Sequence, residues 1–366
     1  MGPGLLHDPY VDMTSHLFLL HIRSALCHSR WSGMGGPLLI TPPSDSYSDK
    51  RGSGARDMEG YQTIMFGFFH LLTLCTLGSY VTPFRICAFN GQHFGEKKVA
   101  NDEILNVVVK IVQRCDICLL QEVHDPKGTV VSKLMSVLNR PKDEFLAVSS
   151  PPLGRKSYTE QYVFIYKSFM VTVRDQYKYE DNDTSAPDVF AREPYIVRFA
   201  LELTALPDLV IIPQHTEPEK AGTELEALYD VFTEVRRRWR CKNVVLMGDF
   251  NAGCKYLSKK KTKSLRLSKD PDFQWLISDG TDTTVKESTS CAYDRIVIYG
   301  EELRNLVKSA GIYNFTKELR LSEAEALKVS DHYPVEMDLG GCRTLLPSLI
   351  LIILSLSSSC GIRSLL

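Results

Sequence analysis

The stretch NVVLMGDF occupies residues 243–250 and joins a continuous apolar run to a glycine and a carboxylate. Its apolar residues do not alternate with polar ones, which is typical of a strand buried on both faces of a sheet. Similar short runs, rich in Val, Ile, Phe and Tyr, recur along the chain and also predict strands. They lie at 84–89, 116–123, 161–166, 194–201, 208–215, 273–277, 293–299 and 332–337.

Two longer stretches between these runs have the periodicity of amphipathic helices. Apolar residues recur with helical spacing from residue 99 to residue 112, and a second apolar stripe runs from 223 to 239. Because the predicted strands outnumber the helices, we expect an α/β protein in which two sheets pack together with helices on the outside.

Several of the predicted strands end in a polar residue of a type used in catalysis. These residues are Asn90, Glu122, His215, Asp249 with Asn251, and Asp331 with His332, while Asp294 lies one residue inside its run. Strand ends and the loops beside them are where sites form in α/β sheets. For any one of these residues a turn or a cap is the better explanation. Together they would build a metal-assisted hydrolytic centre.

The composition of the 366-residue chain, 44% hydrophobic and 24% charged, excludes wholesale disorder, collagen and coiled coil. With 43 Lys and Arg against 44 Asp and Glu, bulk charge cannot hold the protein on nucleic acid, so such binding needs a local basic patch. The segment 255–269 (KYLSKKKTKSLRLSK) is the better candidate, because RRRWR at 236–240 is interpreted as a solvated helix end. The 10 cysteines are too few for a disulfide scaffold.

Both ends of the chain have features of export and membrane attachment. Residues 1–57 are interpreted as a disordered or artefactual extension, and 58–83 resemble a signal peptide around the apolar run at 64–77. Residues 341–366 hold a hydrophobic tail, read as a glycolipid-anchor signal, a short tail anchor or an unprocessed tail. With sequons at 182–184 and 314–316, we expect a protein of the secretory pathway: secreted, in the endoplasmic reticulum or at the cell surface, with membrane association through the tail.

The region 84–340, expected to be the catalytic domain, carries a series of motifs that resembles the deoxyribonuclease I family of the endonuclease/exonuclease/phosphatase superfamily. The motifs are FRICAFNGQHFGE (84–96), LLQEV (119–123), LGRKSYTEQYVF (153–164), VFAREP (189–194), IIPQHTEP (211–218), LYDVF (228–232), MGDFNAGC (247–254), CAYDRIV (291–297) and SDHYPVE (330–336). The resemblance implies a four-layer sandwich of two packed, mostly antiparallel β-sheets flanked by helices. It also implies a divalent-metal-dependent endonuclease that hydrolyses DNA phosphodiester bonds with little sequence specificity.

The same resemblance implies a role for each matching residue. His215 and His332 would be the general acid and base, and Glu160 and Asp294 the carboxylates that orient them. The ligands of an active-site Mg²⁺ or Mn²⁺ and of the phosphate would be Glu122, Asp331, Asp249, Asn251 and Asn90. Histidines can transfer protons near neutral pH, and oxygen ligands suit such hard cations.

Other matching positions imply contacts with DNA and with a structural Ca²⁺. The DNA backbone and minor groove would be held by Arg155, Tyr158, Arg192 and Tyr293. Structural Ca²⁺ would be held by Asp181, Asp188, Glu193, Asp282 and Thr284. One departure is His124, which stands where the family commonly has an arginine that contacts phosphate. This change predicts a weaker DNA contact or a shifted pH dependence.

The cysteines of the catalytic region fall into one expected pair and several expected free thiols. Cys254 and Cys291 match the main disulfide of the family. Cys115 and Cys118 form a C-x-x-C within a strand-like run, where residues three apart point to opposite faces. We therefore expect two free core thiols there rather than a redox pair, and we expect Cys87 to be unpaired as well, together with Cys241.

Two alternative functions remain open at this point. The protein could hydrolyse another phosphodiester or a phosphomonoester, such as a lipid or inositol phosphate, or it could be a catalytically silent binding protein. The DNA-binding motifs argue against the first, and the intact catalytic set argues against the second. As for partners, we expect a DNA-binding monomer with no tight affinity for actin, because Ala147, Ser149 and Tyr195 replace the Tyr, Val and Ala of the family's actin-binding patch.

Overall fold

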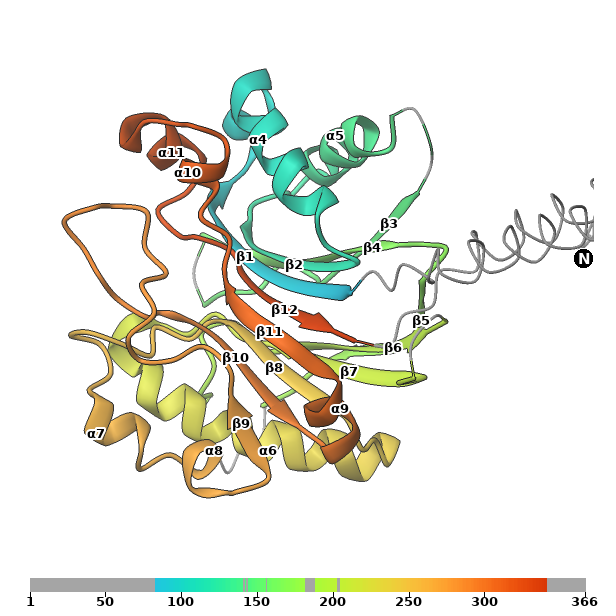
Figure 1. Cartoon of the computed structure of the whole chain (residues 1–366), viewed down its shortest axis with the longest axis vertical. Coiled ribbons are helices and arrows are strands. Elements are labelled where there is room, and N and C mark those ends of the chain that lie inside the picture. Colours follow the sequence, from blue (N-terminus) through green and yellow to red (C-terminus); the bar gives the residue numbers. More distant parts are fainter. Residues whose placement is uncertain are drawn as a thin grey trace, which may run out of the picture. The chain divides into compact units, whose positions relative to one another are not determined.

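Two six-stranded β-sheets form the centre of the computed structural model, which describes residues 83–340 except 141, 143, 156, 182–187 and 203–204 (Figure 1). The expected extension 1–57, the tail 341–366 and the first sequon lie outside the described residues, as does the signal-like segment 58–83 apart from Pro83. Within the described part of the chain, no helix combines the length and the apolarity needed to cross a membrane.

Each sheet contains one parallel pair of strands among antiparallel neighbours. The first sheet has the order β11-β12-β1-β2-β4-β3, with β1 and β2 parallel. The second has the order β5-β6-β7-β8-β10-β9, with β7 and β8 parallel. The strands of the first sheet are β1 (Phe84–Phe94), β2 (Ile117–Val123), β3 (Phe145–Ser149), β4 (Gln161–Lys167), β11 (Val307–Ile312) and β12 (Val335–Leu339). Those of the second are β5 (Val171–Lys178), β6 (Tyr195–Leu201), β7 (Asp208–Pro213), β8 (Val244–Asp249), β9 (Phe273–Trp275) and β10 (Asp294–Tyr299).

Helices cover the outer faces of both sheets, so the expected four-layer sandwich is confirmed (Figure 1). Over the first sheet lie α4 (Asp102–Gln113), α5 (Thr129–Leu138), α10 (Phe315–Glu318) and α11 (Glu323–Val329), with the short α3 (Glu96–Val99) before α4. Over the second lie α6 (Ala221–Trp239), α7 (Lys259–Thr262) and α8 (Arg266–Lys269), while α9 (Glu301–Leu306) follows β10. The α4 helix begins at Asn101, whose side chain accepts hydrogen bonds from two backbone N–H groups of the first turn.

Successive side chains of the central strands point to opposite faces of each sheet, which divides the core into three apolar layers. In β1, Phe84, Ile86 and Ala88 face the second sheet, whereas Cys87 and Phe89 pack under the outer helices. The layer between the sheets also holds Tyr195, which is only 7% exposed. Tyr195 of β6 therefore points its ring into the core and does not present it to a partner, whereas the expectation of no tight actin binding stays a prediction.

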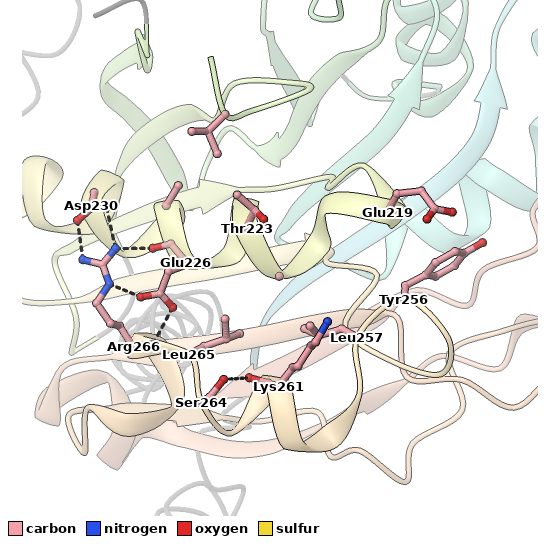
Figure 2. Close-up of a pocket in the computed structure, with 13 residues that line it drawn as sticks. Glu219, Thr223, Glu226, Asp230, Tyr256, Leu257, Lys261, Ser264, Leu265 and Arg266 are labelled. Atoms are coloured by element: carbon pink, nitrogen blue, oxygen red, sulfur yellow. Dashed lines mark hydrogen bonds and ion pairs between the residues drawn. The ribbon is translucent and has the colours of Figure 1, made fainter. Parts of the chain in front are cut away.

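The segment after β8 is held against α6 by an ion cluster (Figure 2). The Arg266 guanidinium donates hydrogen bonds to the carboxylates of Glu226 and Asp230 and lies 4.7 Å from the centre of the Tyr229 ring. Leu257 and Leu265 are buried on the same side, in the core layer beneath α6. The segment is therefore anchored by both charge and apolar contact.

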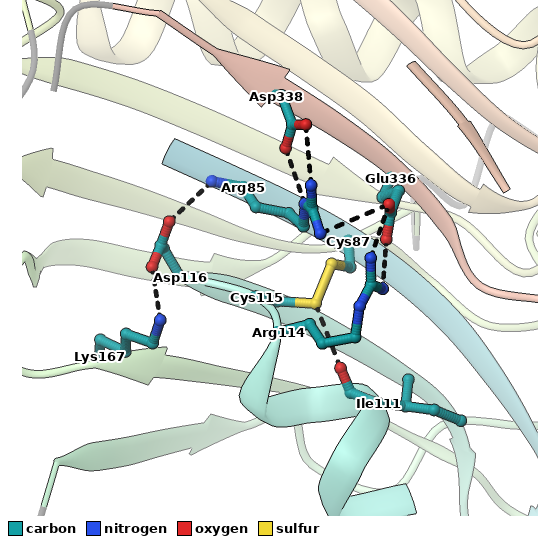
Figure 3. Close-up of a disulfide and its surroundings, with 9 residues drawn as sticks. All are labelled: Arg85, Cys87, Ile111, Arg114, Cys115, Asp116, Lys167, Glu336 and Asp338. Carbon is teal, nitrogen blue, oxygen red and sulfur yellow. Dashed lines mark hydrogen bonds and ion pairs between the residues drawn. A yellow bond between two sulfur atoms is a disulfide. The ribbon is translucent and has the colours of Figure 1, made fainter. Parts of the chain in front are cut away.

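Two disulfides are present among the described residues, and one of them corrects an expectation. Cys254 and Cys291 are bonded, as the resemblance implied. Cys87 and Cys115 are also bonded, so the expectation that both are free is wrong (Figure 3). Cys115 lies between the end of α4 and the start of β2, outside the strand, and the strand rule for side-chain direction does not apply to it. Cys118 and Cys241 are buried free thiols.

Candidate active site

The predicted catalytic residues gather at one edge of the two sheets because of strand direction. Parallel strands β1 and β2 bring Asn90 and Glu122 to this edge at their carboxyl ends, and β7 and β8 do the same for His215 and Asp249. Strands β4, β10 and β12 run antiparallel to them, so their amino ends lie at the same edge. The residues beside those amino ends are Glu160, Asp294 and His332.

The two histidines form the centre of the site, and both are buried. Nδ1 of His215 lies 2.8 Å from Oε2 of Glu160, and Nδ1 of His332 lies 2.7 Å from Oδ2 of Asp294. An ionised carboxylate can only accept a hydrogen bond, so each Nδ1 carries a proton. The two Nε2 atoms then face inward, and each lies 3.6 Å from the same Oδ2 of Asp249.

The surrounding charges favour the protonated form of both imidazoles. Burial lowers the pKa of His215, as does Arg192, but the hydrogen bond with Glu160 and the charges of Glu160 and Asp249 raise it above its usual value. For His332, burial is likewise outweighed by Asp294 and Asp249, and its pKa lies well above the usual value. A positively charged imidazole is the form that can donate a proton to a leaving group.

Glu122 reaches the site through an irregularity in its strand. The register of β2 against β4 shifts between Leu120 and Val123, and Glu122 has a left-handed backbone with φ of 55°. Such bulges redirect side chains and are common beside active sites. Burial alone would raise the pKa of Glu122, but the charge of His215 and the hydrogen bonds from Asn90 and His93 hold it below its usual value.

Oxygen atoms that suit a hard divalent cation converge beside the histidines. The Asn90 amide donates to Glu122 Oε1 at 2.8 Å and to Asp249 Oδ2 at 3.1 Å, so these two carboxylates lie close together. Asp331 is more exposed, with Oδ1 3.8 Å from Nε2 of His332. Carboxylate and amide oxygens are the ligands that Mg²⁺ and Mn²⁺ prefer. The donor set therefore fits the cation that the resemblance implies, and Glu122 and Asp249 could hold it.

The tightest cluster of ligand atoms differs from the metal set inferred from the sequence. Among the described residues, only Asp249, Asp294 and His332 form a group of three or more acidic, His or Cys side chains with ligand atoms within 4.8 Å of one another. Asp294 and His332 belong to this group because they are hydrogen-bonded to each other. Asp249 is the residue common to both sets, since it lies next to each histidine.

Several residues that support the site were not singled out from the sequence. The Gln121 amide donates to the carbonyl of Gln214 and accepts from the N–H of Asp249, so it links the two sheets directly behind the histidines. The Ser330 hydroxyl donates to the Asn90 carbonyl and accepts from the N–H of His332. Both contacts fix candidate catalytic residues relative to neighbouring elements. The sequence signal for each was its place within a quoted motif, LLQEV for Gln121 and SDHYPVE for Ser330.

A second supporting group lies behind His215. The Tyr162 hydroxyl accepts from the backbone N–H of His215, and the buried Gln214 amide donates to the carboxylate of Glu224. Burial raises the pKa of Glu224 to about 7 despite hydrogen bonds from backbone N–H groups.

On the opposite side of the site, the Lys98 ammonium donates to two backbone carbonyls, and burial lowers its pKa to about 8.

The residues expected to contact DNA divide into two groups. Tyr158 is 42% exposed and stacks on His124, with its hydroxyl 2.6 Å from Nδ1 of His93. Tyr293 lies on the other side, with its ring centre 6.3 Å from that of His332. These two rings flank the catalytic centre and are accessible to a substrate.

The two arginines instead make contacts within the protein. Arg192 donates to the backbone carbonyls of His215 and Thr216, so it positions the histidine. Arg155 donates to the carbonyl and the carboxylate of Asp188. In this structure, both guanidinium groups are engaged by protein oxygens, and DNA contact by them stays a prediction.

The residues expected to hold structural Ca²⁺ each have partners in the protein. Asp181 accepts from two backbone N–H groups, Asp188 pairs with Arg155, and Glu193 pairs with Lys178. Asp282 accepts from the hydroxyl of Thr284 and from backbone N–H groups of Thr284 and Cys291. These contacts stabilise the loops themselves, and calcium binding stays a prediction.

Comparison with known proteins places this arrangement in a family. Residues 87–332 match the Endonuclease/Exonuclease/phosphatase family. Deoxyribonuclease gamma of Rattus norvegicus is 49% identical over 71% of this chain and 85% of its own length. Deoxyribonuclease-1-like 1 of Chlorocebus aethiops is 48% identical over 70% of this chain and 84% of its own.

A solved structure of an endonuclease/exonuclease/phosphatase family protein from Bacteroides thetaiotaomicron has the same fold. It covers 71% of this chain and 98% of its own, with a TM-score of 0.53 and 14% sequence identity. This likeness concerns the fold alone. The family match, the identity to named deoxyribonucleases and the paired histidines agree, and the chain belongs to the deoxyribonuclease I family of endonuclease/exonuclease/phosphatase proteins.

Proposed function

We propose that this protein is a divalent-metal-dependent endonuclease that hydrolyses DNA phosphodiester bonds with little sequence specificity. The observation that carries the proposal is the pair of buried imidazoles, His215 and His332, whose Nε2 atoms lie at the same 3.6 Å distance from Asp249 Oδ2. Each imidazole is oriented at Nδ1 by its own carboxylate. Two proton-transfer groups that face one point suit a reaction with one proton to remove and one to deliver.

The chemistry follows from the two Nε2 atoms. One imidazole, in its neutral form, accepts a proton from the water whose oxygen attacks phosphorus, and a new P–O bond forms. The other, in its protonated form, donates its proton to the leaving alkoxide oxygen as the old P–O bond breaks. A bound divalent cation would add positive charge beside the phosphoryl oxygens, where negative charge accumulates. Tyr158 and Tyr293 would contact the neighbouring nucleotides, as the resemblance implies.

A plasmid-nicking assay with Mg²⁺ and Mn²⁺, and with EDTA in parallel, tests the proposal. We expect nicking in the presence of the cations, loss of nicking in EDTA, and a loss of about a hundredfold or more in His215→Ala and His332→Ala, because general acid–base catalysis contributes about 10²–10⁴-fold. Thermal unfolding shows whether each variant is folded. Near wild-type nicking by either folded variant would contradict the assignment.

A panel of other phosphate esters separates the alternative functions. Hydrolysis of an inositol phosphate or a phospholipid, with intact plasmid, would favour a different substrate within the superfamily. Binding of DNA without hydrolysis under every cation would favour a silent binding protein. Similar nicking of plasmids with unrelated sequences would support weak sequence preference, since contacts to the phosphate backbone and the minor groove carry little base information.

We also propose that the protein acts in the secretory pathway or outside the cell. The two disulfides, Cys87–Cys115 and Cys254–Cys291, support this location, because such bonds persist in oxidising compartments and are rare in the cytosol. Expression in cultured cells, followed by peptide mapping of protein from the medium, the microsomes and the cell surface, tests this. Recovery of only reduced protein from the cytosol would contradict it.

A further inference from the structure

A run of exposed lysines follows strand β8, which ends at Asp249. We define the lysine arm as residues 255–263 (KYLSKKKTK), which include α7 and contain no acidic residue. Its lysines are all exposed: Lys255, Lys259, Lys260, Lys261 and Lys263. None of them forms an ion pair with a carboxylate of the described residues, although Lys255 lies 4.9 Å from the Tyr256 ring centre. Their charge is therefore available to an external anion.

The other basic cluster of the chain differs in this respect. At the end of α6, Arg236 lies 4.6 Å from the Tyr299 ring centre, and Arg238 lies 4.1 Å from that of Tyr177. These guanidinium groups cover aromatic side chains and so contribute to packing. The contrast leaves the lysine arm as the stronger candidate for a surface that binds anions.

The backbone of the lysine arm is fixed on both sides. The Cys254–Cys291 disulfide ties the residue that precedes the arm to the loop before β10, and Leu257 and Thr262 are buried. At the other end, the Arg266 cluster holds the following segment to α6 (Figure 2). Charges on a fixed backbone bind with less loss of conformational entropy than charges on a mobile one.

A line of aromatic rings connects the lysine arm to the catalytic pair. The centre of the Tyr256 ring lies 5.5 Å from that of Tyr293, and the Tyr293 ring lies 6.3 Å from that of His332. The arm therefore begins next to the histidines, on the same side as Tyr293. A polymer with regularly spaced phosphates, seated at the histidines and continuing past Tyr293, would meet the lysines next.

We propose that the lysine arm is a second DNA-binding element, which contacts phosphates of the duplex that flank the cleaved one. This inference rests on the proposed function, because the substrate it names is the same polymer. Lys261 also lines a cavity of about 610 Å³ beneath the arm, together with Glu219, Glu226 and Asp230. Carboxylates that line this cavity would repel a phosphate, so we assign the phosphate contacts to Lys259, Lys260 and Lys263.

The arm is tested by the salt dependence of DNA binding. The triple variant Lys259→Gln, Lys260→Gln, Lys263→Gln is compared with wild type on a fluorescent DNA duplex, in EDTA so that no hydrolysis occurs. Each lysine–phosphate contact contributes about 0.9 to the slope of log affinity against log salt concentration. We expect the slope to become shallower by about 3, roughly 1 for each lysine removed, and affinity at low salt to fall.

A matched control removes the same charge at the other end of the molecule. Lys110 lies in the last turn of α4, Lys242 lies two residues before β8, and Lys308 lies in β11 beside the last residues of β12. All three are exposed, and they lie toward the end of the sheets opposite the histidines. The variant Lys110→Gln, Lys242→Gln, Lys308→Gln should keep the wild-type slope, whereas replacement of the three arm lysines by arginine should restore it.

The outcomes distinguish failure of this inference from failure of the proposed function. A wild-type protein that nicks DNA, with an arm variant of unchanged salt slope, would overturn the arm and leave the function standing. A wild-type protein that does not nick DNA under any divalent cation would overturn the function itself. If the arm variant instead loses binding to vesicles of phosphatidylserine and phosphatidylcholine, at an unchanged DNA slope, the arm contacts membrane and not DNA.

Discussion

The tautomer and the orientation of His215 and of His332 each depend on the carboxylate at Nδ1 of that ring. In Asp294→Asn, the amide that replaces the carboxylate can donate to Nδ1 of His332, and this favours the tautomer with its proton on Nε2. We expect kcat for DNA nicking to fall by about 10²–10⁴-fold with little change in KM, because the ring is held in the wrong tautomer.

Asp338→Asn provides the matched control for that substitution. Asp338 pairs with Arg85 at the opposite end of β12, and the same chemical change there should leave nicking near wild type. If Asp294→Asn lowers kcat no more than Asp338→Asn does, the carboxylate does not set the tautomer of His332.

Glu224 predicts a pH dependence of stability. Its pKa is raised by burial to about 7, so between pH 4.5 and 7 the folded protein binds this proton more tightly than the unfolded chain does. The contribution of Glu224 to stability therefore decreases as pH rises through this window. The total decrease is about 3 kcal/mol, because each unit of pKa difference corresponds to about 1.4 kcal/mol.

Replacement by Glu224→Gln tests that pH dependence. The variant has no proton to lose, and its free energy of unfolding should decline less than that of wild type between pH 5 and about 7. Urea unfolding at several pH values measures the difference. Identical pH profiles for the two proteins would show that Glu224 titrates near its ordinary pKa in the folded state.

The residues that meet in the candidate active site could be singled out because their types and their places beside apolar runs are visible in the sequence. Their supporting contacts were not. Gln121 meets the N–H of Asp249 across 128 residues of chain and the carbonyl of Gln214 across 93. Contacts of this kind depend on how two sheets pack, which no local pattern records. The contacts of Arg192 within the protein were missed for the same reason, because the carbonyls of His215 and Thr216 lie in the loop after β7.

At the scale of strands, the apolar pattern found the central strands and missed three at the sheet edges. The unpredicted strands are β3, β5 and β11, and each is at the edge of its sheet. In β5 (VTVRDQYK) and β11 (VKSAGI), half or more of the residues are exposed or half-buried, so no apolar run forms. Edge strands have fewer neighbours to cover them, and their sequences are correspondingly polar.

Gly248, the second-last residue of β8, allows the close approach of the two sheets. Its φ is +132°, and a methyl group there would lie 2.6 Å from the amide nitrogen of Gln121 and would also collide with the carbonyl of Gln214. We expect Gly248→Ala to lower the free energy of unfolding by about 1–3 kcal/mol and to reduce nicking, because Gln121 would be displaced from Asp249.

The control for that glycine is Gly311→Ala in the edge strand β11. An added methyl at Gly311 meets nothing within 4 Å, so its stability and nicking should stay near wild type. Thermal unfolding and nicking of both variants make the comparison. A Gly248→Ala protein as stable and active as Gly311→Ala would mean that the sheets adjust without cost.

The Cys87–Cys115 disulfide ties β1 to the turn before β2, across 28 residues of chain. A closed loop of this size constrains the unfolded chain by about 3–4 kcal/mol. The double variant Cys87→Ser, Cys115→Ser should therefore unfold at a lower urea concentration than wild type. Cys241→Ser, which removes a buried free thiol, shows the effect of the substitution alone. Equal stability of wild type with and without a reducing agent would contradict the prediction.

At the scale of the whole molecule, the exposed edge of the first sheet bears on actin binding. Ala147 and Ser149 lie in β3, where the resemblance implies an aromatic and an apolar anchor in the actin-binding relative, and both are half-buried here. Loss of one aromatic anchor costs about 2–4 kcal/mol of binding free energy. We expect plasmid nicking to be unaffected by a molar excess of monomeric actin, with an actin-sensitive deoxyribonuclease I as the positive control. Inhibition at stoichiometric actin would contradict this.

The two sheets differ in how they use the chain. Strands β5 to β10 come from one continuous stretch of chain, which completes the second sheet. The first sheet is complete only when β12, the last strand in the chain, lies between β1 and β11. On a translating ribosome, His215 and Asp249 emerge well before Asp331, His332 and β12 do. A nascent chain thus holds one imidazole without its counterpart. We therefore expect the nascent chain to be inactive as a nuclease until His332 and β12 have been synthesised.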